Sequence, residues 1–261
     1  MRLQVLVSAV GQRPEELISR MKLRSDAIII NQGQDHAFQK LTRDGYEIRF
    51  YDFKEKGVGL SRNTALLRAD GDILLFSDED ITYDDGYADR ILAEFEKHPE
   101  ADMLLFNIRV GASRATYHIE RYGRVRWYNS GRYPTYSFAV RREKLHRNNI
   151  TFSLLFGGGA KYSNGEDSLF LRDCLKAGLR IYSVPVEIGE EEERESTWFT
   201  GYHEKFFFDR GVLYHYLYGR MAVLFALRFI LTKKNFMCRE IPPKQAFKLM
   251  RRGIRDAKEQ R

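Results

Sequence analysis

Several features are scarce in this sequence of 261 residues, and each scarcity excludes a class of protein. Only two cysteines occur, Cys174 and Cys238, and their positions do not show the spacing of a metal site. We therefore expect two reduced thiols in a cytoplasmic protein and no disulfide scaffold. The first ten residues carry one basic residue and a very short apolar run, which is too little for a secretory signal. No segment resembles a nucleic-acid-binding module, so we expect no nucleic acid partner.

The sequence does contain a large apolar fraction and an uneven positive charge. Hydrophobic residues make up 43% of the chain, which is enough to bury the core of one globular domain with a C-terminal extension. The net charge of +7 comes from basic stretches at 109–147 and 220–261, whereas 187–195 is acidic. This balance favours anionic lipid or phosphate-bearing small molecules as partners.

Strand and helix patterns alternate along the first half of the chain. We expect strands at 3–10, 27–31, 48–53, 73–76 and 103–108, and helices at 14–22 and 85–97. Such alternation predicts a largely parallel sheet with right-handed crossovers and helices on its faces. The predicted fold class is therefore α/β.

The most informative segment, 56–80, is a helix, a turn and a strand that ends in acidic residues. Ser61 can cap the helix, and Gly71 accommodates the turn before the apolar run at 73–76. Three carboxylates follow directly: Asp78, Glu79 and Asp80. Adjacent carboxylates repel one another unless a cation neutralises them, and Mg²⁺ and Mn²⁺ take oxygen ligands. The segment therefore predicts a metal or ligand site, with a solvated acidic turn as the alternative.

A second group of functional residues occurs at 162–185, where an apolar helix pattern begins at Glu166 and Asp167. Acidic residues in a first turn can simply complement the helix dipole. They can also present a general base from a rigid helix end, beneath the glycine-rich loop at 157–159. The pattern alone leaves both interpretations open.

Taken together, these segments resemble a known family. The ordered motifs GLSRNTAL, ADGDILLFSDED and GEDSLFLRDCLKAGLRIYSVP are similar to those of GT-A-fold, family 2 inverting glycosyltransferases of bacterial polysaccharide synthesis. The resemblance spans about residues 3–205 and implies a Rossmann-like central sheet. It also implies a nucleotide-sugar donor, most simply a UDP-sugar, and a glycan or lipid-linked saccharide acceptor.

The resemblance assigns roles to individual residues near the donor. Asp80 is the expected ligand of Mn²⁺ or Mg²⁺, Asp78 lies nearer the ribose or sugar, and Glu79 belongs to the same element. His203 occupies a region where relatives place a further metal or phosphate ligand, although a lone histidine among aromatics is more often a packed core residue. Arg62 matches a basic position near the nucleotide sugar.

The resemblance also assigns the acceptor side of the reaction. Asp167 matches the catalytic base, and Glu166 is expected to bind the acceptor or support the base. One departure concerns the nucleotide: many relatives carry Asp-Asp-Gly-Ser after the second strand, whereas this chain has Asn31 and Gln32. Amide side chains can hydrogen-bond uracil, so we keep both residues as candidates for nucleotide binding.

The predicted domains are a glycosyltransferase domain over 1–205 and a helical, basic extension over 206–261. Within the first, 1–108 would bind the nucleotide sugar and 109–205 the acceptor. Residues 211–232 read as one amphipathic helix, because three ionisable residues argue against a membrane span. Its apolar face either docks on the core or lies in a membrane interface, so we expect a cytoplasmic protein with an optional peripheral contact on the inner face of the cell membrane.

Two other functions compete with this interpretation. A nucleotidyltransferase can use a similar sheet and acidic metal site, but it gives the Glu166 and Asp167 pair no obvious task, and 8–14 is a poor phosphate loop. A catalytically silent sugar-binding or scaffold protein of a membrane glycan assembly is the other alternative. The joint presence of Asp78, Asp80 and Asp167 argues against silence.

Overall fold

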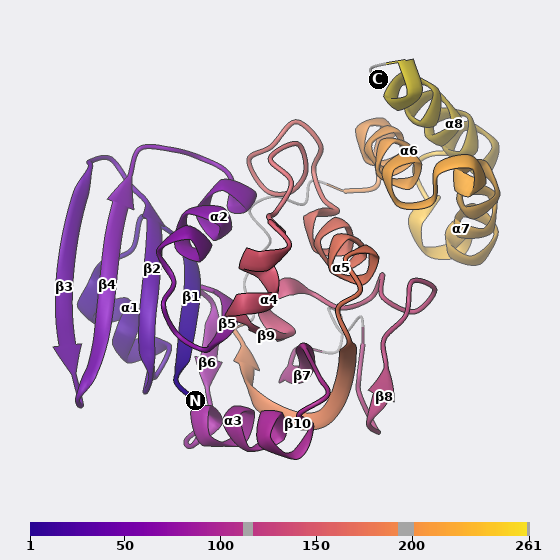
Figure 1. The fold of residues 1–261 in the computed structure, drawn as a ribbon. Helices are drawn as coiled ribbons and strands as arrows, with labels where there is room; N and C mark the ends of the chain where they lie inside the picture. Colours follow the sequence, from indigo (N-terminus) through magenta and orange to yellow (C-terminus); the bar gives the residue numbers. More distant parts are fainter. Residues whose placement is uncertain (112–116, 193–200, 260–261) are drawn as a thin grey trace.

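A computed structural model of the protein describes residues 1–111, 117–192 and 201–259. Figure 1 shows one large twisted sheet covered by helices, with a separate group of three helices at the C-terminal end. The strands are β1 (Leu3–Val10), β2 (Asp26–Gln32), β3 (Ala37–Arg43), β4 (Tyr46–Phe53), β5 (Ile73–Asp78), β6 (Ile81–Tyr83), β7 (Met103–Arg109), β8 (Gly123–Arg124), β9 (Phe138–Arg141) and β10 (Ile181–Glu191). The helices are α1 (Pro14–Arg20), α2 (Val58–Arg68), α3 (Tyr87–Lys97), α4 (Arg142–Arg147), α5 (Glu166–Lys176), α6 (Glu204–Tyr218), α7 (Ala222–Met237) and α8 (Pro243–Glu259), with short 3₁₀ turns at Thr135–Ser137 and Gly219–Met221.

The predicted α/β class is confirmed. The strand order is β3-β4-β2-β1-β5-β9-β7-β10-β6, with β8 paired to β10. β4, β2, β1 and β5 are parallel, as the alternating pattern predicts, whereas β3 and β9 run antiparallel to their neighbours. The sheet is therefore parallel where it carries the first motif and mixed beyond it.

Side chains of β1 alternate between two cores, one on each face of the sheet. Val5 and Val7 pack in the cluster that contains α1 and α3, whereas Leu6 packs in the cluster that contains α2 and α5. This period of two explains why the strand is buried from Leu3 to Ala9, because both of its faces are covered. The helices pack on both faces of the sheet, so the carboxyl ends of its parallel strands lie along one rigid edge.

β3 was not predicted. It is an exposed edge strand in antiparallel pairing with β4, and its side chains are mostly exposed, so it has no apolar run to reveal it. Its signal was the turn: Asp44 and Gly45 both have positive φ, at 51° and 86°, and Asp-Gly is typical of a two-residue hairpin.

The start of α2 differs from the prediction. The helix begins at Val58 after Gly57, so Ser61 is not its cap and lies one turn inside. The buried Ser61 hydroxyl instead donates to the Ser8 hydroxyl at 3.0 Å and thereby joins α2 to β1. Gly71 follows the helix, and a Cβ there would lie 2.6 Å from the Cβ of Gln4, so this turn needs glycine for close approach.

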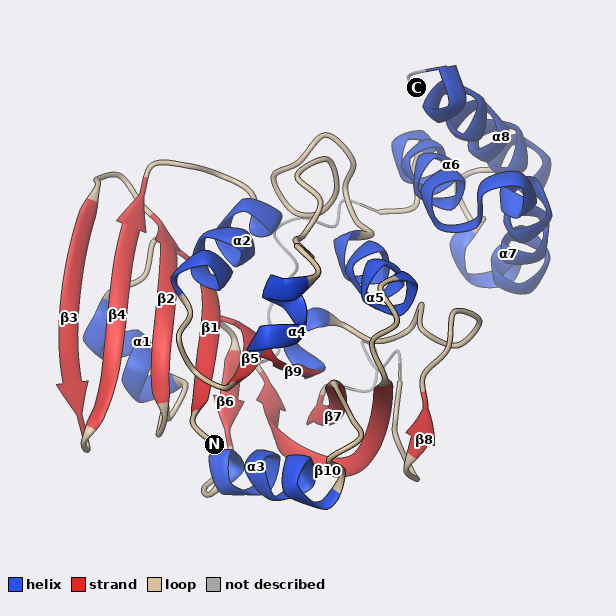
Figure 2. Cartoon of the chain, viewed as in Figure 1, coloured by secondary structure: helices blue, strands red, loops and turns tan. Residues whose placement is uncertain are grey.

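The prediction of one helix over 211–232 is wrong. α6 ends at Tyr218, Gly219 adopts a positive φ of 54°, and α7 begins after a short 3₁₀ turn. α6, α7 and α8 form their own apolar cluster, set apart from the sheet in Figure 2. In the part of the chain that the structure describes, no helix has the length and apolarity needed to cross a bilayer. Residues 193–195 of the acidic stretch and the last two residues of the C-terminal extension lie outside the described residues.

Two glycines allow α6 and α8 to pack closely. A Cβ on Gly211 would lie 2.1 Å from the carbonyl oxygen of Met250, and one on Gly253 would lie 2.2 Å from that of Phe208. The buried residues of α8 are Ala246, Met250, Gly253 and Ala257, and three of these four are glycine or alanine. The two helices therefore meet backbone to backbone.

α6 also joins the helical group to the rest of the chain. The buried Asp209 carboxylate accepts the N–H of Ser163 at 2.9 Å, and Leu213 packs against Gly165. Val212 and Leu213 share an apolar cluster with Leu169 of α5. One helix of the extension thus packs directly beside the segment that carries Glu166 and Asp167.

Candidate active site

Polar side chains gather where the parallel strands end. In the register of the sheet, Asn31 on β2 is paired with Asp52 on β4, and Ser8 on β1 is paired with Asp78 on β5. Ligand crevices of α/β sheets form outside the carboxyl ends of strands, so this edge is the expected site. The structure places the residues predicted at 31–32 and at 78 on this one edge.

A cavity of about 480 Å³ opens at the ends of β1, β2 and β4. Its lining contains Asn31 and Gln32, the two amides predicted to bind the nucleotide, and several acidic residues. The lining residues are Val10, Gly11, Gln12, Asn31, Gln32, Gly33, Gln34, Asp35, Asp52, Glu55 and Lys56. The cavity lies beside the first motif, whose first residue, Lys56, belongs to its lining.

The two amides have different tasks in this cavity. Asn31 is 2% exposed, its Oδ1 accepts the N–H of Gln12 at 2.9 Å, and its Nδ2 donates to the Gln12 carbonyl and to Asp52. These bonds hold the loop after β1 in place. The Oε1 of Gln32 accepts the N–H of Gly57 at 2.8 Å and so fixes the chain just before α2.

Asp52 was missed by the sequence reasoning. Its carboxylate lies over Gly33, where a Cβ would come within 1.9 Å of Oδ1, so a side chain at that position would displace the Asp52 carboxylate. It also accepts from Asn31 at 3.2 Å and lines the cavity. The available signal was an aspartate near the end of a predicted strand. The cavity therefore has a carboxylate from the end of β4, in addition to Asp35 from the segment after β2.

Arg62 connects the two sequence motifs. Its guanidinium is 4% exposed and donates through NH2 to Asp78 at 3.0 and 3.3 Å. Through NH1 it donates to Glu166 at 3.2 Å and to Asp167 at 3.3 Å. Burial lowers the pKa of Arg62, but attraction to the three carboxylates outweighs this and raises the pKa above its usual value. One permanent cation thus joins Asp78 to two carboxylates that are 104 and 105 residues away from the arginine in the sequence.

Asp167 lies in the first turn of α5, as predicted. Besides Arg62, it accepts a hydrogen bond from the hydroxyl of Thr135, a residue that no motif in the sequence indicated. Burial and the charge of Glu166 raise the pKa of Asp167 to about 7, while Arg62 and the Thr135 hydrogen bond oppose the shift. A carboxylate with this pKa is suited to accept a proton near neutral pH.

Glu166 is oriented by the backbone beside it. Its Oε2 accepts the N–H of Gly165 at 3.1 Å, and its side chain is 13% exposed. The predicted glycine-rich loop does lie against it, because a Cβ on Gly157 would be 2.9 Å from the Glu166 Cδ. A cavity of about 620 Å³ is lined by this loop, by Glu166 and Asp167, and by His203. The structure thus brings His203 to the cavity of the predicted base.

The three consecutive acidic residues make different contacts: Asp78 and Glu79 through their carboxylates, and Asp80 through its backbone. Both oxygens of Asp78 accept from Arg62, and the Glu79 carboxylate accepts the N–H of Val10 at 2.8 Å. The backbone carbonyl of Asp80 accepts the N–H of Glu192 at 2.8 Å, which pins the turn after β5. The interpretation of this segment as a metal or ligand site stays a prediction, as does the alternative of a solvated acidic turn.

The carboxylate and imidazole donors fit a divalent metal chemically, since Mn²⁺ and Mg²⁺ take oxygen ligands and Mn²⁺ also takes nitrogen. Among the described residues, however, no three or more His, Cys, Asp or Glu side chains are grouped so as to hold an ion. The assignment of Asp78, Asp80 and His203 as ligands therefore stays a prediction.

The chain was compared with known proteins. The family model described as "Glycosyl transferase family 2" matches residues 8–156. No curated protein matched the chain. Among solved structures, S. aureus TarS 1–349 in complex with UDP-GlcNAc is similar, with a TM-score of 0.64 and 15% identity over 92% of this chain and 74% of that one.

Two further structures of the same neighbour agree. The fragment in complex with UDP has a TM-score of 0.60 and 16% identity, again over 92% of this chain and 74% of that one. Full TarS of S. aureus has a TM-score of 0.61 and 16% identity over 90% of this chain and 44% of that one. At this identity the likeness establishes the fold, and it confirms the predicted GT-A architecture.

Proposed function

Because the chain belongs to glycosyl transferase family 2 and is thus a glycosyltransferase, we propose that it moves a sugar from a UDP-sugar to a hydroxyl of a glycan or lipid-linked saccharide in cell-surface polysaccharide synthesis. The observation that carries the proposal is the Arg62 cluster. It joins the strand end at Asp78 to Glu166 and Asp167 on α5. A donor-binding strand end and a candidate base are thereby held within one network.

The UDP moiety would occupy the cavity at the ends of β1, β2 and β4. The structural neighbour TarS is found with UDP and with UDP-GlcNAc, which supports a UDP donor here. Asp52 and Gln32 would read the uracil, because a carboxylate accepts the base N–H and an amide can donate or accept. Asn31 would act by positioning the Gln12 loop.

Asp167 would act as the general base. It accepts the proton of the acceptor hydroxyl while that oxygen bonds to the anomeric carbon, and the bond from this carbon to the diphosphate oxygen breaks. Attack from the face opposite the leaving group inverts the anomeric centre in a single displacement. Thr135 and Arg62 hold the carboxylate in place, and Glu166 would orient the acceptor or support the base.

We further propose that Asp80 is the direct ligand of a Mn²⁺ or Mg²⁺ ion, with Asp78 and His203 beside it. A bound ion would offset the negative charge that develops on the departing diphosphate. Arg62 donates to both carboxylate oxygens of Asp78, so it would hold this side chain oriented toward the donor.

The test is an assay of UDP release and product formation with a panel of UDP-sugars and saccharide acceptors, run with Mn²⁺ and with chelator. We expect Asp167→Asn to lower transfer by about 10²–10⁴-fold while UDP binding is retained, because the amide cannot take the proton. Asp173→Asn, an exposed carboxylate on the same helix, is the matched control. Equal transfer by the Asp167 variant and the parent would remove Asp167 from the mechanism.

The expected location is cytoplasmic, and a peripheral contact to the inner face of the cell membrane stays an option. The absence of turnover with every nucleotide sugar would instead favour the silent sugar-binding alternative. Transfer of a nucleotidyl group in the same assay would favour the nucleotidyltransferase.

A further inference from the structure

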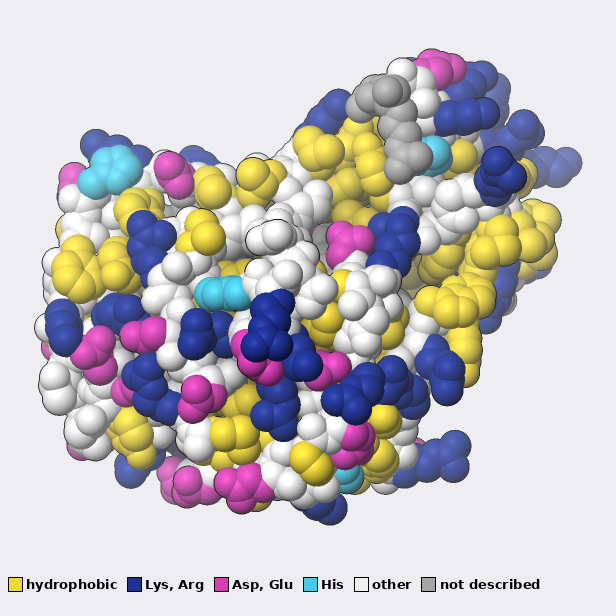
Figure 3. All heavy atoms as spheres, in the orientation of Figure 1, with side chains coloured by type: hydrophobic (Ala, Val, Ile, Leu, Met, Phe, Trp, Pro, Cys, Tyr) yellow, Lys and Arg dark blue, Asp and Glu magenta, His cyan; other side chains and the backbone are white. Residues whose placement is uncertain are grey.

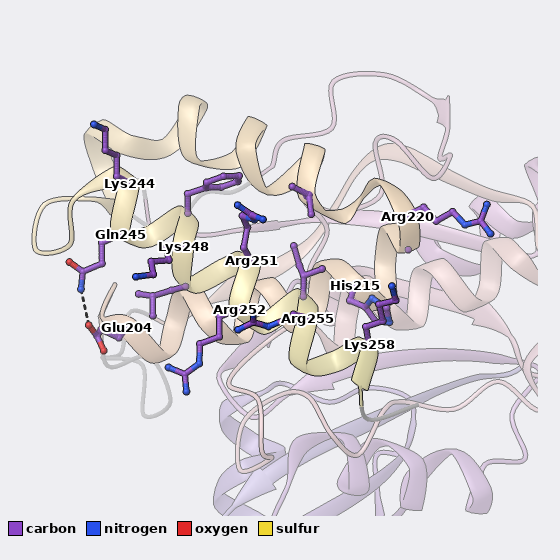
Figure 4. A pocket seen from close by; sticks show the side chains of 15 residues that line it. Glu204, His215, Arg220, Lys244, Gln245, Lys248, Arg251, Arg252, Arg255 and Lys258 are labelled. Atoms are coloured by element: carbon purple, nitrogen blue, oxygen red, sulfur yellow. Dashed lines mark hydrogen bonds between the residues drawn. The ribbon is translucent and has the colours of Figure 1, made fainter.

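The positive charge of the chain is concentrated in its C-terminal helices. Residues 201–259 contain thirteen Lys and Arg against five Asp and Glu, an excess that exceeds the +7 of the whole chain. A groove of about 1450 Å³ runs along α8 and is lined by most of these basic side chains (Figure 4). The basic lining residues are His215, Arg220, Lys244, Lys248, Arg251, Arg252, Arg255 and Lys258. Among the lining residues, Glu204 is the one carboxylate.

The two sides of α8 explain this arrangement. Ala246, Met250, Gly253 and Ala257 are buried against the other helices. All six Lys and Arg residues of the helix are exposed and recur every three or four positions from Lys244 to Lys258. Because such spacing places residues on the same side of a helix, the charges form a continuous stripe.

α7 carries an apolar surface that the protein leaves uncovered. Leu224 is 65% exposed and Leu231 is 61% exposed, which is unusual for leucines at helical spacing on one side of a helix. The full set of exposed apolar residues from 221 to 237 is Met221, Val223, Leu224, Leu227, Leu231 and Phe236. This helix therefore presents aliphatic side chains to the surroundings along most of its length.

Aromatic residues extend this surface. Trp127 and Tyr128 are 57% and 64% exposed, and the Trp127 ring lies edge-on to Phe225 of α7 at 6.4 Å between centroids. Val223 of α7 also lines the basic groove, so the apolar and basic surfaces adjoin. Figure 3 shows hydrophobic and basic side chains side by side over α7 and α8.

We propose that the exposed side of α7, Trp127, Tyr128 and the basic stripe of α8 together bind the surface of an anionic lipid bilayer. The aliphatic and aromatic side chains enter the interfacial layer, where tryptophan and tyrosine are favoured. The basic stripe lies against anionic headgroups. A soluble polyanion would account for the basic stripe, but it leaves the exposed leucines without a partner.

This contact differs from a membrane span. Arg228, Lys233 and Lys234 lie on α7 itself, and charges of this kind are costly in hydrocarbon but compatible with a helix lying in the interface. The proposal does not depend on the identity of the donor or on the assignment of the base. It predicts that the enzyme works beside a lipid surface.

The test is sedimentation of the full chain with vesicles of phosphatidylglycerol or of phosphatidylcholine. The apolar variant is Leu224→Asn with Leu231→Asn, and its matched control is Leu67→Asn with Leu154→Asn, two exposed leucines outside the C-terminal helices. The basic variant is Lys248→Gln, Arg251→Gln, Arg252→Gln and Arg255→Gln. Its matched control changes four exposed basic residues elsewhere, Arg13, Lys40, Lys97 and Arg147, to Gln.

We expect the parent to sediment with phosphatidylglycerol and not with phosphatidylcholine. The basic variant should lose at least about 100-fold in affinity, since each basic residue near an anionic surface contributes several-fold. The apolar variant should also lose binding, while both controls bind like the parent. Circular dichroism and thermal midpoints establish that every variant compared is folded.

Three results would overturn the proposal. One is a folded parent that binds neither vesicle. Another is an equal loss of vesicle binding in the control variants, which would show that binding depends only on the net charge or the apolarity of the chain and not on this surface. The third is an apolar variant that binds like the parent and is displaced by soluble dextran sulfate, which would assign the groove to a polyanion.

Discussion

At the scale of single residues, Arg62 holds the candidate site together. Its guanidinium is almost fully buried and lies between Asp78, Glu166 and Asp167. Removing one member of a buried ionic group leaves the other charges buried without a partner. This lowers the free energy of unfolding by more than the intact ion pair contributes to it. The arginine is therefore expected to matter for stability and for the ionisation of Asp167 at the same time.

We predict that Arg62→Met destabilises the protein by about 3–5 kcal/mol at pH 8. The cost should be smaller at low pH, because protonation of the carboxylates relieves their mutual repulsion. Urea unfolding at the two pH values measures both effects. Arg68→Met on the same helix is the control, since Arg68 contacts the rings of Tyr51 and Phe53 and none of the three carboxylates. A pH-independent loss equal to that of the control would contradict the account.

A second prediction follows from the pKa of Asp167, which is raised to about 7, mainly by burial. A base must be ionised to accept a proton, so kcat/KM should fall as the pH drops below about 7. Because the folded protein favours the protonated carboxyl, Asp167 contributes to the free energy of unfolding at low pH. This contribution is lost as the pH rises through about 7. Asp167→Asn should therefore be more stable than the parent above pH 7. A flat activity profile between pH 5 and pH 8, in a protein that stays folded, would refute this role.

At the scale of helices and strands, α6 and α8 depend on glycine at their crossing. Gly253 faces the Phe208 carbonyl so closely that a methyl group has no room. In a helix, alanine is otherwise favoured over glycine by about 1 kcal/mol. At this position a steric clash with the Phe208 carbonyl therefore disfavours alanine, whereas helix propensity favours it.

We predict that Gly253→Ala lowers the free energy of unfolding by about 1–3 kcal/mol, against the helix propensity, because the backbones must separate. Limited proteolysis should show earlier cleavage within α6–α8. Gly131→Ala is the control, since no atom lies within 4 Å of the position that its Cβ would occupy. A Gly253 variant as stable as the parent would show that the helices do not meet as described.

Local patterns predicted some elements and missed others for physical reasons. β1 was found because it is a short, mainly apolar run, and α5 because its apolar residues repeat with the period of a helix and glycines stand at its ends. β3 was missed because an exposed edge strand has no apolar period. The break at Gly219 was missed because apolar residues continue on both sides of it, so composition gives no sign of two helices.

The site was predictable where a motif lies within one short segment. Asp78 and Asp80 follow an apolar strand directly, and Asp167 starts a helix, so their placement could be read locally. The contacts of Arg62 with the distant carboxylates and of Thr135 with Asp167 depend on the register of the whole sheet. Asp52 reaches the cavity only because β4 pairs with β2, and no local pattern encodes that pairing.

At the scale of the whole molecule, the candidate active site and the excess positive charge lie in different parts of the chain. The sheet edge holds the carboxylates, Arg62 and the cavity proposed for the donor, whereas the C-terminal helices carry the positive charge and an exposed apolar surface. α6 links the two parts through Asp209 and Ser163, next to the loop that leads into α5. A surface contact of the helices would therefore bring the acceptor side of the site close to a membrane.

The account rests most on the claim that the sheet edge binds a nucleoside diphosphate together with a metal ion. Thermal unfolding with uridine, guanosine, thymidine and cytidine diphosphates, each with Mn²⁺ and with chelator, tests it directly. A ligand present at about 100 times its Kd adds about 2.7 kcal/mol, which raises the midpoint by several degrees. We predict such a rise with UDP and Mn²⁺, lost on chelation. No rise with any of the nucleotides would contradict the claim.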